Sequence, residues 1–573
     1  MKTSINLSIS ILILASVFAC SITSSDSSSI ATDSLSIANG QAAFSQNCSS
    51  CHNFKQDGIG PHLGGLTRTV SSDWITNFIN NPNSMIESGD ERAAGLFSKY
   101  KTVMPAFSTY TDDQLKELVA FLHTKKEPDP RKEFVDPNAL KDPIPEKIPM
   151  SDIVVNLELF TQIPASSEEK PSTRIAKLDV QPTTGELFIM DLRGKLYHMK
   201  GKQPEVYLDM NKEKPKFIHK PGLATGFGSF AFHPEFTKNG LLYTTHTEPP
   251  GSAKADFDYP DSIKVTLQWV VSEWKTKTPS AFPFSGESRE LLRVNMVSGI
   301  HGVQEIVFNP LVNNGDEDYG LLYIGVGDGG SAENGFPFLC HSPQKIWGSV
   351  LRIDPSGRNS VNGHYGIPEK NPFVKSDDAK TVKEIFAFGF RNPHRITWSK
   401  AGQIFVSNVG HHNAESLYII SSGSDSGWPI REGTFVIDPS QNMHNIYPLG
   451  SDDAKLKINY PVAQYDHDEG NAIAGGFEYR GKALPQLVGK FVFGDIVKGR
   501  LFYVEMKDLK LGSQAPIMEW QVSLGGQIKT LSELCGADKV DERFGRDSKG
   551  ELYITTKPDG KVYRLKSSTI KKL

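Results

Sequence analysis

Positive charge is not concentrated anywhere in this sequence of 573 residues: 62 Lys and Arg stand against 66 Asp and Glu, and no long basic run occurs. Domains that bind nucleic acid carry clustered basic residues, so we expect no nucleic-acid partner. The Walker A sequence and the Gly-x-Ser-x-Gly motif of serine hydrolases are also missing. Phosphoryl transfer on a P-loop and serine hydrolysis therefore have no support.

Long apolar runs are scarce, and the run over residues 9–19 is too short to span a bilayer in the usual way. It follows the basic Lys2 and ends at Cys20, which predicts a lipoprotein-type signal over residues 1–20. The alternative is an ordinary secretory signal with a chance cysteine. Residues 21–37 are Ser-rich and too polar to fold, which predicts a flexible tether. We therefore expect an exported protein, periplasmic or on the cell surface, that is lipid-anchored to a membrane.

Cysteine is rare, with five residues that divide by role. Cys20 is the candidate lipidation site, and Cys48 and Cys51 belong to the motif described next. Cys340 and Cys535 remain, and an even pair in an oxidising compartment can form a disulfide. The alternative is two buried thiols that lie far apart.

Cys48-Ser49-Ser50-Cys51-His52 is the C-x-x-C-H motif that attaches a c-type haem. The thiols of Cys48 and Cys51 add to the haem vinyl groups, and His52 becomes an axial ligand of the iron. Met104 offers a thioether as the opposite ligand, and a His/Met pair raises the haem potential in a way that suits electron transfer. The motif therefore predicts haem c in an electron carrier.

Residues 38–126 have the pattern of a small helical domain. Thr111 and Gln114 form a capping-box pair that predicts the start of a helix. Apolar residues then follow at helical spacing, namely Leu115, Leu118, Val119 and Leu122. With the haem motif and Met104, this segment resembles class I cytochrome c, which implies an all-α cytochrome c domain. Residues 127–150 are rich in Pro and charge, which predicts an extended linker.

Residues 151–573 repeat one pattern, in which a glycine at a turn precedes a strand of aliphatic and aromatic residues. Few stretches in this part have a helical period. The repetition predicts an all-β propeller of six blades, with a large β-sandwich as the alternative. The six glycines are Gly185, Gly240, Gly320, Gly402, Gly489 and Gly550.

One motif in this part is misleading. Gly325-Val-Gly-Asp-Gly-Gly330 matches the dinucleotide fingerprint G-x-G-x-x-G and follows a predicted strand. The fingerprint requires a helix that opens at its end, whereas residues 331–337 have the composition of a loop. We therefore reject a dinucleotide site.

Several segments over residues 170–566 resemble, in order, the soluble pyrroloquinoline quinone (PQQ)-dependent sugar dehydrogenases of the glucose/sorbosone dehydrogenase group. The family fold is a six-bladed propeller, which agrees with the repeat count. The segments include Phe230-Ala-Phe-His-Pro-Glu-Phe, Trp347-Gly-Ser-Val-Leu-Arg-Ile-Asp-Pro, Ala387-Phe-Gly-Phe-Arg391-Asn392-Pro393, Ser426-Gly-Trp428-Pro429 and Tyr479-Arg-Gly-Lys-Ala-Leu-Pro.

The resemblance implies a set of site residues. His301 corresponds to the general base that removes a proton from a sugar hydroxyl, a role that suits the pKa range of imidazole. Arg391 corresponds to the residue that polarises the PQQ carbonyl through a fixed charge. The remaining PQQ contacts implied are Asn392 beside the cofactor, Trp428 near the quinone, and Lys498 and Arg543 at its carboxylates.

The resemblance also implies calcium, held by backbone carbonyls at Gly410 and His411. Three positions depart from the family pattern. Ala224 and Ile300 stand where the glucose enzymes have a substrate-binding Gln and Asp, and Asp541 stands near the position of a second Arg. These departures leave PQQ binding and glucose preference open.

The sequence therefore predicts a quinohaemoprotein that oxidises a sugar hydroxyl with PQQ and passes electrons to its own haem c. A downstream acceptor, another cytochrome or a terminal oxidase, would then reoxidise the haem. One alternative is a propeller without PQQ that binds a glycan or a protein, with the cytochrome as a separate carrier. Another keeps PQQ but oxidises a non-sugar alcohol or an aldehyde.

Overall fold

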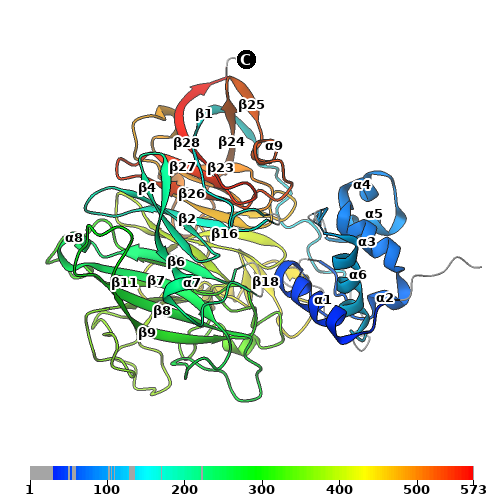
Figure 1. The fold of residues 1–573 in the computed structure, drawn as a ribbon, viewed down its shortest axis with the longest axis horizontal. Coiled ribbons are helices and arrows are strands. Elements are labelled where there is room, and N and C mark those ends of the chain that lie inside the picture. Colours follow the sequence, from blue (N-terminus) through cyan, green and yellow to red (C-terminus); the bar gives the residue numbers. More distant parts are fainter. Residues whose placement is uncertain are drawn as a thin grey trace, which may run out of the picture.

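The computed structural model describes residues 30–48, 52–54, 60–100, 103–104, 106–108, 110–127, 136–168, 171–220 and 224–571. The expected lipidation site Cys20 and the second haem thiol Cys51 lie outside these residues. Within them, a helical N-terminal domain stands beside a large β domain (Figure 1). No helix among the described residues is both long and apolar enough to cross a bilayer.

Among the described residues of the N-terminal domain, six helices surround one apolar core, and the longest two, α1 and α6, pack on each other. The predicted capping box is confirmed, since the Thr111 hydroxyl accepts from the Gln114 N–H and the Gln114 side chain accepts from the Thr111 N–H. The helices are α1 (Ser34–Asn47), α2 (Leu66–Thr69), α3 (Ser72–Asn80), α4 (Pro82–Glu87), α5 (Glu91–Tyr100) and α6 (Asp112–His123).

Helix α1 begins inside the range expected for the tether. The carboxylate of Asp33 accepts a hydrogen bond of 2.9 Å from the Ser36 N–H and so caps the helix. Ile30 and Ile37 pack against the apolar core of the domain. The helical domain therefore includes residues from the expected tether, because a capping side chain and two apolar contacts suffice in an otherwise polar stretch.

The β domain is a six-bladed propeller, as predicted. The first strands of successive blades contact one another in a closed ring, and four blades are separate four-stranded sheets. These are β2–β5 (Ile175–Val180, Leu187–Asp191, Lys195–Lys200, Gln203–Asp209), β6–β9 (Phe227–Phe232, Leu241–Glu248, Leu267–Lys275, Glu287–Met296), β10–β13 (Glu305–Phe308, Leu322–Val326, Ser349–Ile353, Ile385–Phe388) and β14–β16 with β20 (Pro393–Trp398, Ile404–Asn408, Ala414–Ile420, Ala463–Asp466).

The last two blades are joined by β1 (Met150–Gln162). This strand pairs antiparallel with β28 and completes the sixth blade from the other end of the domain, while it also pairs parallel with β24. The ring is thereby closed by the two ends of the domain. The other strands are β21–β24 (Ile473–Glu478, Lys490–Asp495, Leu501–Glu505, Met518–Leu524) and β26–β28 (Glu542–Arg546, Leu552–Thr556, Lys561–Ile570), with β25 (Gln527–Lys529) on the edge of β24.

The six repeated glycines all stand immediately or shortly before the second strand of a blade. Each has a φ between 66° and 87°, a left-handed conformation that side chains other than glycine rarely adopt. The repeat in the sequence is therefore the turn between the first two strands of each blade.

The described part of the linker, from residue 136 onward, lies against the propeller. The Leu140 N–H donates to the Ile446 carbonyl at 2.8 Å, and the Tyr447 hydroxyl donates to Asp136 at 3.0 Å. Ile446 and Tyr447 form β19 of a small insert whose other strands are β17 (Arg431–Glu432) and β18 (Phe435–Ile437). Cys340 and Cys535 are both buried free thiols, so the alternative of two separate thiols holds.

Candidate functional site

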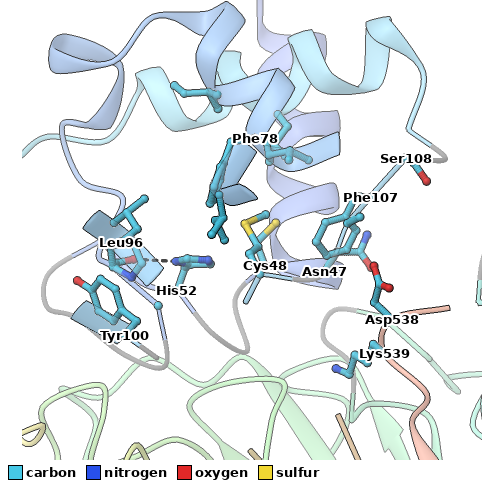
Figure 2. A pocket seen from close by; sticks show the side chains of 18 of the residues that line it. Asn47, Cys48, His52, Phe78, Leu96, Tyr100, Phe107, Ser108, Asp538 and Lys539 are labelled. Atoms are coloured by element: carbon cyan, nitrogen blue, oxygen red, sulfur yellow. Dashed lines mark hydrogen bonds between the residues drawn. The ribbon is translucent and has the colours of Figure 1, made fainter. Parts of the chain in front are cut away.

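A cavity of about 660 Å³ opens in the helical domain and contains the predicted haem ligands. The Nδ1 of His52 lies 2.7 Å from the Pro61 carbonyl oxygen, which can only accept, so Nδ1 carries the proton (Figure 2). A hydrogen bond of this kind orients an imidazole and leaves Nε2 for a metal. Gly60 stands so close that an added Cβ would lie 2.4 Å from Cε1 of His52.

Cys48 and Met104 line the same cavity. Cys48 is the C-cap of α1, so the helix fixes the position of its thiol. The rest of the cavity in this domain is mostly apolar, with Trp74, Phe78 and other side chains from α3 and α6 in its walls. A thiol, an oriented imidazole, a thioether and an apolar cavity together fit a covalently attached haem.

The propeller forms one side of this cavity, which the sequence did not predict. Asp538 and Lys539 approach it from the C-terminal part of the chain in Figure 2. Asp541 and Lys557 also line it. No local pattern joins these residues to the haem motif, because they lie more than 400 positions away in the sequence and meet it only when the domains pack.

His301 is held by a buried carboxylate. Its Nδ1 lies 2.8 Å from Oδ1 of Asp328, whose side chain is fully buried. Asp328 also accepts from the Trp428 indole at 3.1 Å and from the Gly330 N–H at 2.8 Å. The backbone of His301 has a φ of 50°, a strained conformation for a residue other than glycine and one that clusters at functional sites. The contacts fix the ring and leave Nε2 for a substrate.

Arg391 lies in the same group of residues and is 1% exposed. Its guanidinium forms an ion pair with Glu333, donates to the Gly410 carbonyl, and lies over the Trp428 ring at 5.8 Å. Glu333 also accepts from Nδ1 of His411 at 3.1 Å. Burial raises the pKa of Glu333, but Arg391 and His411 outweigh it and hold the pKa well below its ordinary value. Glu333 is therefore ionised, and the sequence analysis missed it.

The predicted calcium position has an unexpected contact. The Gly410 carbonyl, one of the two expected calcium ligands, accepts from Arg391. The N–H groups of residues 411–414 all donate to one oxygen of the buried Glu432. Among the described residues, the only cluster of His, Cys, Asp and Glu side chains with suitable ligand spacing for a metal lies elsewhere, at Asp142, Asp466 and Asp468. Calcium at the backbone carbonyls of Gly410 and His411 stays a prediction.

The other predicted PQQ contacts fall into separate groups. Arg543 pairs with Asp541 at 2.8 Å, and Asp541 also pairs with Lys557 at 2.5 Å. Lys498 donates to the Asp468 carbonyl at 2.8 Å instead. Asp541, which departs from the family pattern, is thus paired with two cations, Arg543 and Lys557. The net charge of these three residues is positive.

Two buried donors in these groups have no hydrogen-bond partner among the described residues, namely Nε of Arg391 and Nε of Arg543. Buried donors rarely stay unpaired, so both fit a ligand that supplies acceptors. PQQ carries carbonyls and carboxylates, so Arg391 and Arg543 fit it. Asn392, beside Arg391, is also buried.

Tyr100 lies between the haem cavity and the group of residues around His301. It is buried, lines the haem cavity at the end of α5, and lies edge-on to the rings of His412 and His444 at 6.3 Å each. His412 and His444 are stacked with centroids 3.9 Å apart. His411, next in the series, lies 5.9 Å from His444 and 5.9 Å from Trp428. Aromatic rings therefore run without a break from the haem cavity to the residues around His301.

Two family profiles match the chain: "Glucose / Sorbosone dehydrogenase" over residues 176–533 and "Cytochrome c" over residues 37–126. HIPL1 protein of Arabidopsis thaliana is 27% identical over 332 residues, which are 51% of this chain and 44% of that protein. Hedgehog-interacting protein of Homo sapiens is 26% identical over 393 residues (66% and 49%). Quinoprotein glucose dehydrogenase B of Acinetobacter calcoaceticus is 23% identical over 233 residues (38% and 42%).

The chain spans about half the length of the curated relatives it matches. Among solved structures, the apo-form of the soluble aldose sugar dehydrogenase from Escherichia coli has a TM-score of 0.51 at 15% identity. The match covers 73% of this chain and 100% of that one, so it extends over the propeller and supports its fold.

Proposed function

Because this chain belongs to the glucose/sorbosone dehydrogenase family and carries a cytochrome c domain, we propose that it oxidises a sugar hydroxyl with PQQ and passes the electrons to its own haem c. The bound PQQ would supply a quinone carbonyl that accepts hydride. His301 removes the hydroxyl proton through Nε2, while Asp328 fixes the ring and stabilises the imidazolium that forms.

The other residues of the site stabilise the charge that develops and hold the catalytic side chains in position. Arg391 supplies a fixed positive charge where negative charge develops, and burial strengthens this interaction because little water screens it. Glu333 holds the guanidinium of Arg391 in place. Trp428 covers this cation and also donates to Asp328, so one indole positions both catalytic residues.

The contact of Tyr100 is the observation that carries the proposal. Tyr100 of the haem cavity lies edge-on to His412 and His444, and His411 lies between His444 and Trp428, so the haem domain contacts the propeller close to His301 and Arg391. Electrons that leave this site therefore have their acceptor in the same chain. Tethering also keeps the acceptor at a local concentration of roughly millimolar or more.

The test is haem reduction by a panel of aldoses in the full-length protein after reconstitution with PQQ. We expect a rate constant that does not change on dilution, since the transfer is intramolecular. His301→Ala should abolish substrate-driven haem reduction, whereas dithionite still reduces the haem. His364→Ala, an exposed histidine elsewhere on the propeller, is the matched control. A rate that falls in proportion to protein concentration contradicts the proposal.

A second function has some support. Arg391 already has Glu333 as its partner, and the relative named for Hedgehog interaction matches two thirds of this chain. The propeller would then bind a glycan or a protein without PQQ, and the cytochrome would act as a separate carrier. Titration of the apoprotein with PQQ discriminates, because the quinone absorbance changes on binding only if the first proposal is right.

We further propose that the protein is exported, anchored through Cys20 and reoxidised by a cytochrome or a terminal oxidase. The apolar run before Cys20 and the Ser-rich stretch after it support the anchor. A substrate panel that includes non-sugar alcohols and aldehydes tests the donor class, since Ala224 and Ile300 remove polar contacts expected for glucose.

A further inference from the structure

The haem cavity has a wall built by the propeller. Segment 532–541 and Lys557 with Pro558 line it opposite the ligands of the helical domain. Lys557 follows β27 directly and is 5% exposed, so this lining residue has a buried side chain. Its carbonyl accepts from the Thr173 hydroxyl at 2.8 Å, which fixes the backbone there.

A compact set of charges surrounds Lys557. Its amine pairs with Asp541 at 2.5 Å, and Asp541 also pairs with Arg543 at 2.8 Å. Asp541 has a φ of 52° and donates its N–H to the Ile496 carbonyl at 2.7 Å, so its position is constrained. The set holds two cations and one anion. It extends from the haem cavity to Arg543, which has an unpaired buried donor.

We propose that Lys557 is a proton acceptor coupled to the haem: its amine gains a proton when the iron gains an electron. One electron reduces Fe³⁺ to Fe²⁺, and one proton converts the Lys557 amine to an ammonium. Both leave when an external one-electron acceptor oxidises the haem. The oxidation of an alcohol releases two electrons and two protons, so each electron has one proton to accompany it. The proposal needs the haem but does not depend on the quinone chemistry.

The pKa of Lys557 lies where its amine can gain and lose a proton near neutral pH. Burial lowers its pKa to about 7; Asp541 opposes this effect, and Arg543 and Arg174 add to it. An added negative charge on the haem favours the ammonium, so haem reduction raises this pKa. By reciprocity, loss of the Lys557 charge as pH rises through about 7 makes haem reduction less favourable. The haem potential should therefore fall with rising pH in this window.

The other groups around Lys557 have different roles. Arg543 and Arg174 stay charged at these pH values. Burial and the neighbouring cations hold the pKa of His394 well below its ordinary value, so that ring stays neutral. Burial raises the pKa of Asp541, but Lys557 and Arg543 outweigh it and keep the carboxylate ionised. The remaining charges at this wall are those of Lys539, Asp538 and Glu533.

The experiment is a redox titration of the haem in the full-length protein over a range of pH on both sides of 7, without PQQ or sugar. The wild-type potential should fall as pH rises through about 7. Lys557→Met should lower the potential at acidic pH and remove this pH dependence. Lys214→Met is the matched control, because burial also lowers the pKa of Lys214 but that residue does not line the cavity.

A second variant tests the proposal if Lys557→Met does not fold. Asp541→Asn suits the left-handed backbone and removes the charge that opposes the lowering of the Lys557 pKa by burial. The pH-dependent range of the potential should then move to lower pH. A wild-type pH dependence in Lys557→Met, or in Asp541→Asn, overturns the proposal. Either result leaves the proposed sugar oxidation untouched, since no substrate is present.

Discussion

Asp328→Asn tests the site with the smallest change in shape. The fully buried carboxylate accepts from His301 and Gly330 at one oxygen and from Trp428 at the other. An amide of the same size retains one acceptor oxygen only. If that oxygen faces His301, the amide nitrogen meets the Trp428 indole donor, and two donors oppose each other. The negative charge beside His301 is lost in either orientation.

The structure sets the magnitude of two effects of Asp328→Asn: the unpaired buried donor lowers stability, and the lost carboxylate slows catalysis. One buried donor left without an acceptor costs about 1–3 kcal/mol, so the melting temperature should fall while the protein still folds. A positioned general base contributes roughly 10²–10⁴-fold, and an imidazole without its orienting carboxylate loses much of this. We therefore expect kcat for substrate-driven haem reduction to fall by at least about 10²-fold.

The assay compares two reductants on one sample. Stopped-flow absorbance follows haem reduction by the best aldose of the panel and, separately, by dithionite. Asp328→Asn should slow the first and leave the second unchanged. Asp318→Asn is a matched control, since this carboxylate also binds a tyrosine and an arginine in the propeller but lies outside the His301 group. A wild-type kcat in folded Asp328→Asn would refute the assignment of His301 as an oriented base.

Three further predictions concern the haem and the anchor. Met104→Ala should leave the haem attached but lower its potential, because the soft axial ligand is lost; an unchanged potential and spectrum would contradict this ligand. Gly60→Ala should displace the His52 ring, because the new Cβ lies 2.4 Å from Cε1, and a normal haem spectrum would show that the ring adapts. Cys20→Ala should release the protein from membranes, whereas a soluble wild-type protein that begins at another residue would contradict lipidation.

The blades could be predicted from the sequence because each depends on a local turn. Gly402 and Gly489 need a left-handed φ whatever the rest of the chain does, and apolar strand residues follow each of them. The start of α6 was equally local, since Thr111 and Gln114 bind each other three residues apart. His301 and Arg391 could be found only through the family resemblance, because single residues carry no periodic signal.

Contacts between distant segments account for what the sequence did not reveal. Glu333 lies in a loop with no motif of its own, and its role becomes apparent only when Arg391 and His411 pack on it. Lys557 has no motif of its own either, and its place in the haem cavity becomes apparent only when the helical domain lies against the propeller. Local sequence patterns thus predict helices, strands and turns. Sites between the two domains become apparent only in the folded structure.

The closure of the ring by β1 has a consequence for how the protein is made. Strand β1 pairs with β28, which follows β2 to β27 in the chain, so the sixth blade stays open until β28 has been synthesised. Domains usually fold from the N-terminus as the chain emerges, so the helical domain is complete while the propeller is still growing. The machinery that attaches haem to Cys48 therefore has access to this domain before the propeller wall covers the cavity.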